Sequence, residues 1–123
     1  MNAPAPALKV SVRRAELGAE AARIDAFVAE HPDGTLFHRP QWSLAAERGC
    51  GQRAHYLVAE RGGVLIGCLP LSEIRSPLFG NALVSAGFGT GGGILGDGVE
   101  ALADAAVALG YPSVELRGGP IPE

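Results

Sequence analysis

AHYLVAERGGVLIGCLPLS, residues 54–72, consists of two apolar runs, 54–60 and 64–72, joined through Arg61, Gly62 and Gly63. Two such runs around a Gly-Gly pair predict an antiparallel hairpin, because glycine readily adopts the positive φ that a two-residue turn requires. The register that this turn imposes on the two strands is Arg61 with Val64, Leu57 with Cys68, and His55 with Pro70. Since Pro70 has no N–H to donate, we expect the ladder to loosen into a bulge or bend there.

The sequence on either side of the hairpin predicts alternating helices and strands. The expected elements, in chain order, are a strand at 9–13, a helix at 18–30, a helix at 40–48, strands at 54–60, 64–72 and 82–86, a helix at 101–109 and a strand at 113–117. Pro40 suits a first helical position and Gly49 the residue just past a helix end, and Trp42, Ala45 and Ala46 would form the buried face. This order predicts an α/β (α+β) fold with a mixed sheet, a central antiparallel hairpin and helices on both faces.

Length and composition narrow the class of protein. The 123 residues suit one domain, and a net charge of −3 with scattered basic residues argues against direct DNA binding. Residues 1–8 alternate Ala and Pro and predict a disordered tail, and they hold no apolar stretch long enough for a signal sequence or a membrane span. We therefore expect a cytoplasmic protein, in which Cys50 and Cys68 stay reduced and behave as buried small hydrophobes.

A glycine-rich run, FGNALVSAGFGTGGGILGDG at 79–98, holds eight glycines in twenty residues. Residues 87–92 match the GxGxxG spelling of a phosphate-binding turn. A dinucleotide fold places that motif at its first βα turn, with an acidic residue about 20 positions later, so we interpret this run as a structural loop. Phe88 and Thr90, inside the run, are the side chains most free to contact a ligand.

Isolated polar residues give weaker indications of a site. His31, His38 and His55 are too scattered to form a metal set or a catalytic triad, and surface or core-edge positions explain them better. Arg39 and Arg75 flank predicted turns, where a guanidinium could hold a phosphate of a nucleotide-activated sugar. Solvated surface charge is the interpretation that we favour for both arginines.

Three segments carry a resemblance to a known family. TLFHRPQW at 35–42, AHYLVAERGGVLIGCLPLSEIRSPLFGNALVSAGF at 54–88 and VELRGG at 114–119 resemble the FemAB-like acyltransferases, most of all the group associated with bacterial exopolysaccharide and exosortase (PEP-CTERM) gene clusters. Members of that family contain two GNAT-like domains in one chain and transfer an amino acid from aminoacyl-tRNA to a peptidoglycan precursor. The resemblance implies that residues 9–123 are most of the first GNAT-like domain.

One departure from the GNAT pattern bears on the role of this chain. GNAT enzymes hold the pyrophosphate of coenzyme A with a Q/R-x-x-G-x-G/A turn that leads into a helix, and no Gln or Arg precedes the glycines here. We therefore expect no cofactor in this chain, with aminoacyl-tRNA or acyl-CoA bound by a second GNAT-like domain. This domain would then supply a wall of the cleft for the acceptor, an envelope or polysaccharide precursor, and would be inactive alone; the catalytic residues are not indicated.

Two other interpretations stay open. The chain could be a GNAT-like binding or interaction module without catalysis, or a small acetyl-CoA-dependent N-acetyltransferase that uses the turn at 87–93. Because the sequence ends at GGPIPE directly after a predicted strand, we expect a partial domain with apolar surface uncovered around Val114 and Leu116. Such a surface predicts self-association.

Overall fold

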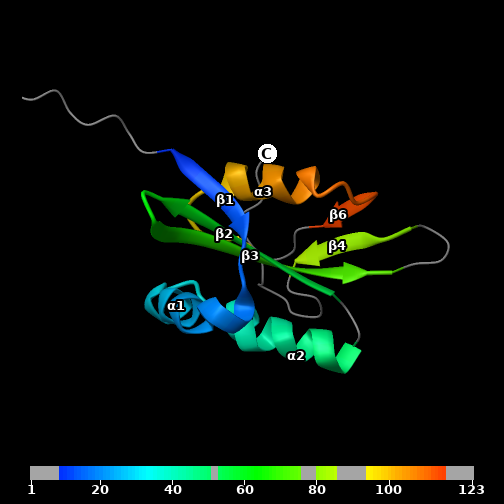
Figure 1. Cartoon of the computed structure of the whole chain (residues 1–123), viewed down its shortest axis with the longest axis horizontal. Helices are drawn as coiled ribbons and strands as arrows, with labels where there is room; N and C mark the ends of the chain where they lie inside the picture. The colour runs from blue at the N-terminus through cyan, green and yellow to red at the C-terminus, as the bar shows by residue number, and fades with distance from the viewer. Residues whose placement is uncertain (1–8, 51–52, 76–79, 86–93, 116–123) are drawn as a thin grey trace, which may run out of the picture.

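The computed structural model describes residues 9–50, 53–75, 80–85 and 94–115, without the side chains of Phe37, Cys50, Ser113 and Glu115. The elements are β1 (Val10–Arg14), α1 (Leu17–Glu30), the 3-10 turn η1 (Leu36–His38), α2 (Pro40–Cys50), β2 (Arg53–Arg61), β3 (Val64–Ile74), β4 (Ala82–Ser85), β5 (Leu95–Gly96), α3 (Val99–Ala108) and β6 (Ser113–Glu115). The predicted alternation of helices and strands is confirmed (Figure 1). The tail at 1–8, the glycines at 87–93 and residues Phe88, Thr90 and Leu116 lie outside the described residues.

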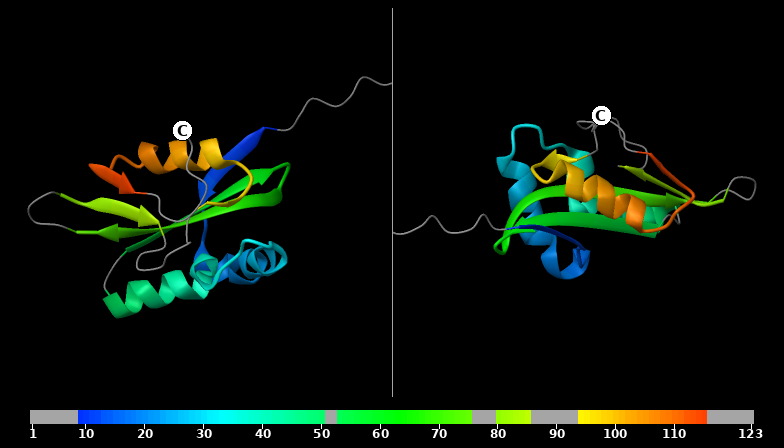
Figure 2. Two further views of the ribbon diagram at one scale, coloured as in Figure 1. Left: turned by 180° about the vertical axis from the view of Figure 1, so that it is seen from behind. Right: turned by 90° about the horizontal axis from the view of Figure 1, so that it is seen from above.

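A mixed sheet organises the molecule. Its strand order is β1-β2-β3-β4-β6, with the two-residue β5 paired to β3. Every pairing is antiparallel except that of β4 with β6, which is parallel and is connected through α3. Helices α1 and α2 lie on one face of the sheet and α3 on the other (Figures 1 and 2). No helix in the described part of the chain has the length and apolar character needed to cross a membrane.

The hairpin turns where the sequence predicts, but the predicted register of its two strands is wrong beyond the tip. Arg61 pairs with Val64, as expected. Ala59 then pairs with Gly67 and Glu60 with Leu65, so Ile66 is an extra residue and the register shifts by one. The observed pairs that replace the predicted ones are Leu57 with Leu69, Val58 with Cys68, Tyr56 with Pro70, and His55 with Leu71.

The bulge lies at Ile66, far from Pro70, and β5 explains its position. Gly67 pairs with Gly96, and a Cβ on Gly67 would overlap the carbonyl oxygen of Asp97. The amide of Asp97 donates to the carbonyl of Ile66 at 2.8 Å, so the extra residue supplies the acceptor that holds this crossing. The pairing with β2 continues through Pro70 without a shift, and the described part of β4 pairs with β3 only from Leu71 onward.

Alternating side chains of the central strands form a core on each face. On the α3 side the buried cluster contains Leu57, Ala59, Leu69, Leu71, Leu83, Ile94, Leu102 and Ala106. On the α1 and α2 side it contains Ala15, Ile24, Val28, Tyr56, Val58, Cys68 and Leu95. Val114, which the sequence predicts to be uncovered, packs against the α3-side cluster. Val114 is half-buried against this cluster, so the exposed apolar patch that the sequence predicts is not present at this residue.

Helix α2 begins at Pro40 as predicted but buries a different face. Ser43 and Ala46 are buried, Trp42 is half-buried and Ala45 is exposed. Because Ser43 and Ala46 follow the fully buried Pro40 at a spacing of three, the contact face is rotated away from Ala45. The helix also runs through Gly49 to Cys50, whereas the sequence predicts an end before Gly49.

The Cys68 thiol is expected to be unreactive in the folded protein. It is fully buried beside Tyr56, and burial raises its pKa to about 11. Because the thiolate is the reactive species, an aromatic disulfide reagent should modify Cys68 only at the rate of unfolding. The measurement uses a Cys50→Ser background with and without denaturant. Rapid modification under native conditions would contradict this prediction.

Candidate functional site

A buried carboxylate lies at the end of β3. Glu73 continues the alternation of Leu69 and Leu71, so its side chain is on the α3 side of the sheet, and the residue is only 6% exposed. Its Oε1 accepts from the Tyr111 hydroxyl at 2.6 Å, and its Oε2 accepts from Asn81 Nδ2 at 3.2 Å. Arg75 Nε lies 3.5 Å from Oε2. The carboxylate thus connects β3 to the start of β4 and to the segment that precedes β6.

His55 completes this cluster from the neighbouring strand. Its Nε2 lies 3.0 Å from the Tyr111 hydroxyl and 3.4 Å from Glu73 Oε1. The rings of His55 and Tyr111 meet edge to face, with centroids 5.6 Å apart. His55 is 5% exposed, and its Nδ1 has no hydrogen-bond partner among the residues that the structure describes. We call these residues, His55, Glu73, Tyr111, Asn81 and Arg75, the Glu73 cluster.

The electrostatics of the Glu73 cluster set its protonation. The hydrogen bond from Tyr111 lowers the pKa of Glu73, although burial opposes it, and the same bond raises the pKa of Tyr111. Burial lowers the pKa of His55, with Glu73 opposing. At neutral pH the cluster therefore contains a carboxylate, a phenol and a neutral imidazole. Since the phenol donates to Glu73, its oxygen accepts the Nε2 proton of His55, which leaves the lone pair of this neutral imidazole on the buried Nδ1.

A shallow hollow of about 480 Å³ adjoins the cluster. Its walls are Gly80, Asn81 and the segment 109–112, so Tyr111 and Asn81 belong to both features. Gly80 and Gly110 both have positive φ, and a Cβ on Gly80 would press on the ring of Pro112 at 3.3 Å. Glycine at position 80 therefore allows this turn to approach Pro112 closely, whereas Gly110 is required only for its positive φ, since a Cβ there would meet no atom within 4 Å.

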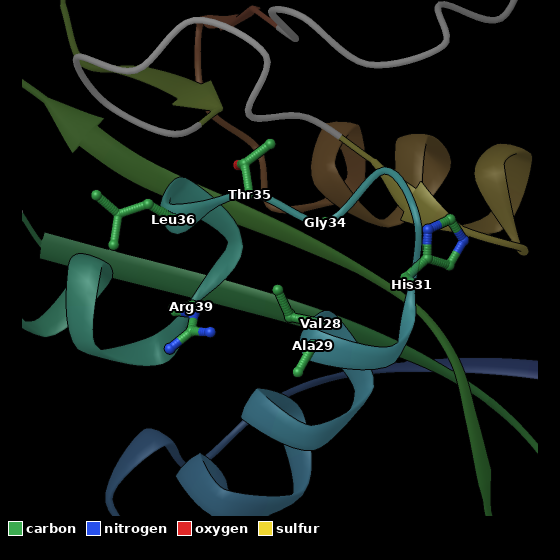
Figure 3. A pocket seen from close by; sticks show the side chains of 7 residues that line it. All are labelled: Val28, Ala29, His31, Gly34, Thr35, Leu36 and Arg39. Carbon is green, nitrogen blue, oxygen red and sulfur yellow. The ribbon is translucent and has the colours of Figure 1, made fainter.

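A second hollow, of about 420 Å³, lies between the end of α1 and the start of α2 (Figure 3). Its lining residues are Val28, Ala29, His31, Gly34, Thr35, Leu36 and Arg39. The Arg39 side chain is 46% exposed, and its Nε lies 3.8 Å from Asp25 Oδ1. A guanidinium held in this way keeps donors for an anion such as a phosphate.

The wall of this second hollow is fixed by His38. Its Nδ1 accepts from the backbone N–H of Thr35 at 3.1 Å and lies 2.9 Å from the Thr35 hydroxyl, and its carbonyl accepts from Tyr56 Oη at 2.5 Å. His38 is almost fully buried. This histidine therefore stabilises η1.

The structure separates the two predicted ligand-contacting residues that it describes, Arg39 and Arg75. Arg39 lies on the α1 and α2 side, whereas Arg75 follows β3 and is 76% exposed beside Glu73. His31 lines the second hollow, whose wall His38 holds through Thr35, and His55 belongs to the Glu73 cluster. Sequence reasoning missed Glu73, although an acidic residue in register with Leu69 and Leu71 on an apolar strand is a signal that could have identified it.

Neither a metal-binding group among the described residues nor a similar known protein indicates the function of this site. Within the described ranges, no group of three His, Cys, Asp or Glu side chains is arranged to hold a metal ion. Comparison of the chain with protein-family models, curated proteins and solved structures finds no match.

Proposed function

We propose that this chain is the first GNAT-like domain of a FemAB-like N-acyltransferase and supplies a wall of its acceptor cleft. The observation that supports this is the element order: strand, two helices, three antiparallel strands, and then α3 leading to a parallel neighbour of β4. The same order is what the resemblance in sequence implies. In open α/β sheets, ligands bind beyond the carboxyl ends of parallel strands, and here the glycines at 87–93 follow β4 in the sequence.

In this proposal a second GNAT-like domain holds the acyl donor. The connection from β4 to α3 has the glycines of a pyrophosphate turn but lacks the leading Gln or Arg. Aminoacyl-tRNA or acyl-CoA would therefore bind to the second domain, and this chain would contact the acceptor. The acceptor is an amine on an envelope or exopolysaccharide precursor.

The hollow in Figure 3 is the best place on this chain for a phosphate of that precursor. Arg39 lines it with a half-exposed guanidinium, and the long contact to Asp25 leaves most of its donors available. Arg75 is the weaker choice, because it lines none of the hollows described above and lies beside the carboxylate of Glu73. A guanidinium binds phosphate through two parallel hydrogen bonds, which suits a diphosphate-linked sugar.

A titration with a uridine-diphosphate-linked amino sugar tests the proposal. We expect the backbone amides of Thr35 and Arg39 to shift in nuclear magnetic resonance spectra, and Arg39→Gln to weaken binding about five- to tenfold through the lost charge-assisted bonds. Arg48→Gln is the matched control, since Arg48 is an exposed arginine of α2 outside the hollow. An equal loss in both variants, or no binding, would contradict the proposal. Low-micromolar binding of acetyl-CoA would instead favour a self-sufficient N-acetyltransferase.

A further inference from the structure

A third hollow, of about 430 Å³, lies where β2 begins, beside the start of α1 and the end of α2. Two arginines and two glutamates line it: Arg14, Arg53, Glu16 and Glu47. All four are exposed, and the half-buried Leu17 and Leu44 supply an apolar part of the lining. The hollow is separate from both the Glu73 cluster and the hollow that contains Arg39.

One residue, Ala54, holds opposite charges in place at this hollow. Arg14 Nη2 donates to the Ala54 carbonyl at 3.0 Å, and the Ala54 N–H donates to Glu47 Oε2 at 2.9 Å. Each side chain uses one atom for this contact, so Arg14 retains further N–H donors and Glu47 retains its other carboxylate oxygen. A cation and an anion are thus positioned by the two backbone groups of the same residue.

These opposite charges do not neutralise one another by contact. Among the described residues, neither arginine of the hollow forms an ion pair within 4.0 Å with a carboxylate. On the neighbouring surface, by contrast, the arginines do form ion pairs: Arg13 and Arg23 each pair with both Glu20 and Glu60. The hollow therefore keeps both signs of charge available to a ligand.

We propose that this hollow binds a small zwitterion, an amino acid with an apolar side chain. The carboxylate of the ligand contacts Arg14 and Arg53, the ammonium group contacts Glu16 and Glu47, and the side chain packs on Leu17 and Leu44. A guanidinium is the side chain best suited to a carboxylate, because it can donate two parallel hydrogen bonds. The proposal does not depend on acyl transfer, since it uses a different hollow and a different ligand.

Leucine and two truncated analogues test the requirement for both charges. 4-Methylpentanoate lacks the ammonium group and isopentylamine lacks the carboxylate, while the side chain is the same. Titrated into the full chain at pH 7, leucine should shift the amides of Ala54 and Glu16 with a dissociation constant in the millimolar range. We expect it to bind at least tenfold more tightly than either analogue.

Two conservative variants locate the binding. Arg53→Gln should weaken leucine binding about five- to tenfold and leave isopentylamine unaffected, since only the carboxylate contact is lost. Glu47→Gln keeps an acceptor for the Ala54 N–H and should weaken leucine but not 4-methylpentanoate. Arg61→Gln and Glu30→Gln, at exposed positions outside the hollow, are the matched controls. Leucine that binds the parent protein no better than its analogues do, or that binds both variants as tightly as the parent protein, would overturn the proposal.

Discussion

Gly67→Ala is expected to lower the free energy of unfolding by about 3 kcal/mol, at the upper end of the usual cost of overpacking a core. The added Cβ would overlap the carbonyl oxygen of Asp97 and lie 3.1 Å from that of Leu95. Both are backbone atoms, which cannot move aside as a flexible side chain can. Relief requires β5 to separate from β3, which breaks the bond between Asp97 N and Ile66 O. Chemical denaturation followed by far-ultraviolet circular dichroism measures the change.

Gly18→Ala is the matched control for this experiment. Gly18 lies in α1, and a Cβ there would have no atom within 4 Å. The same substitution should leave stability unchanged or raise it by about 0.5–1 kcal/mol, because alanine favours the helix. Ordinary substitutions lower the free energy of unfolding by about 1 kcal/mol. If Gly67→Ala lowers it by no more than that, then β5 does not pack against β3 as described.

Tyr111→Phe is expected to cost about 1–3 kcal/mol at pH 7, because it removes a hydrogen bond to a buried carboxylate. The phenol supplies the shortest contact that Glu73 receives, at 2.6 Å, and the ring itself would remain. The variant leaves Glu73 with Asn81, His55 and Arg75 as its remaining close partners. Because both residues act through one bond, combining Tyr111→Phe with Glu73→Gln should cost less than the sum of the two single changes.

The cost of Tyr111→Phe should shrink on acidification. The pKa of Glu73 is lowered in the folded state, first by the Tyr111 hydrogen bond, so its stabilisation is fully present above the unfolded pKa, about 4.3 for a glutamate. That stabilisation is lost as the pH falls through the folded pKa. Tyr111→Phe removes the largest cause of the lowering, and the variant should therefore lose less stability in acid than the parent protein does.

Tyr56→Phe is the control for this pH dependence. Tyr56 donates to a backbone carbonyl, that of His38, and not to a carboxylate. Loss of this neutral hydrogen bond should lower the free energy of unfolding by about 0.5–2 kcal/mol. The decrease should be the same at pH 7 and in acid. A cost of Tyr111→Phe that stays constant with pH would show that the bond to Glu73 does not lower the pKa of that carboxylate.

Local features of the sequence were sufficient for the order of the predicted helices and strands, but not for the short β5 and the turn η1. The turn at Gly62 and Gly63, the start of α2 at Pro40 and the end of α3 before Gly110 depend on residues within a few positions of each other. The mixed sheet also follows, because one late helix between two strands favours a parallel pair. Side-chain alternation and the conformational limits of proline and glycine act over short separations, and these can be read along the chain.

Contacts between distant segments decided the rest. The register of β2 against β3 depends on Gly67 meeting Gly96, 29 positions away, so no pattern within the hairpin reveals the extra residue at Ile66. The face that α2 buries depends on how the helix lies against the sheet, and its own sequence allowed Ala45 as readily as Ser43.

The Glu73 cluster also depends on contacts between distant segments. Glu73 is 18 positions from His55 and 38 from Tyr111, and only the pairing of β2 with β3 and the return of the chain after α3 bring them within hydrogen-bond distance. The sequence by itself determined where the longer strands, the helices and the hairpin turn occur, because those preferences are local. Tertiary structure decided which polar groups are buried together, because a carboxylate leaves water only where donors from other segments replace its hydration.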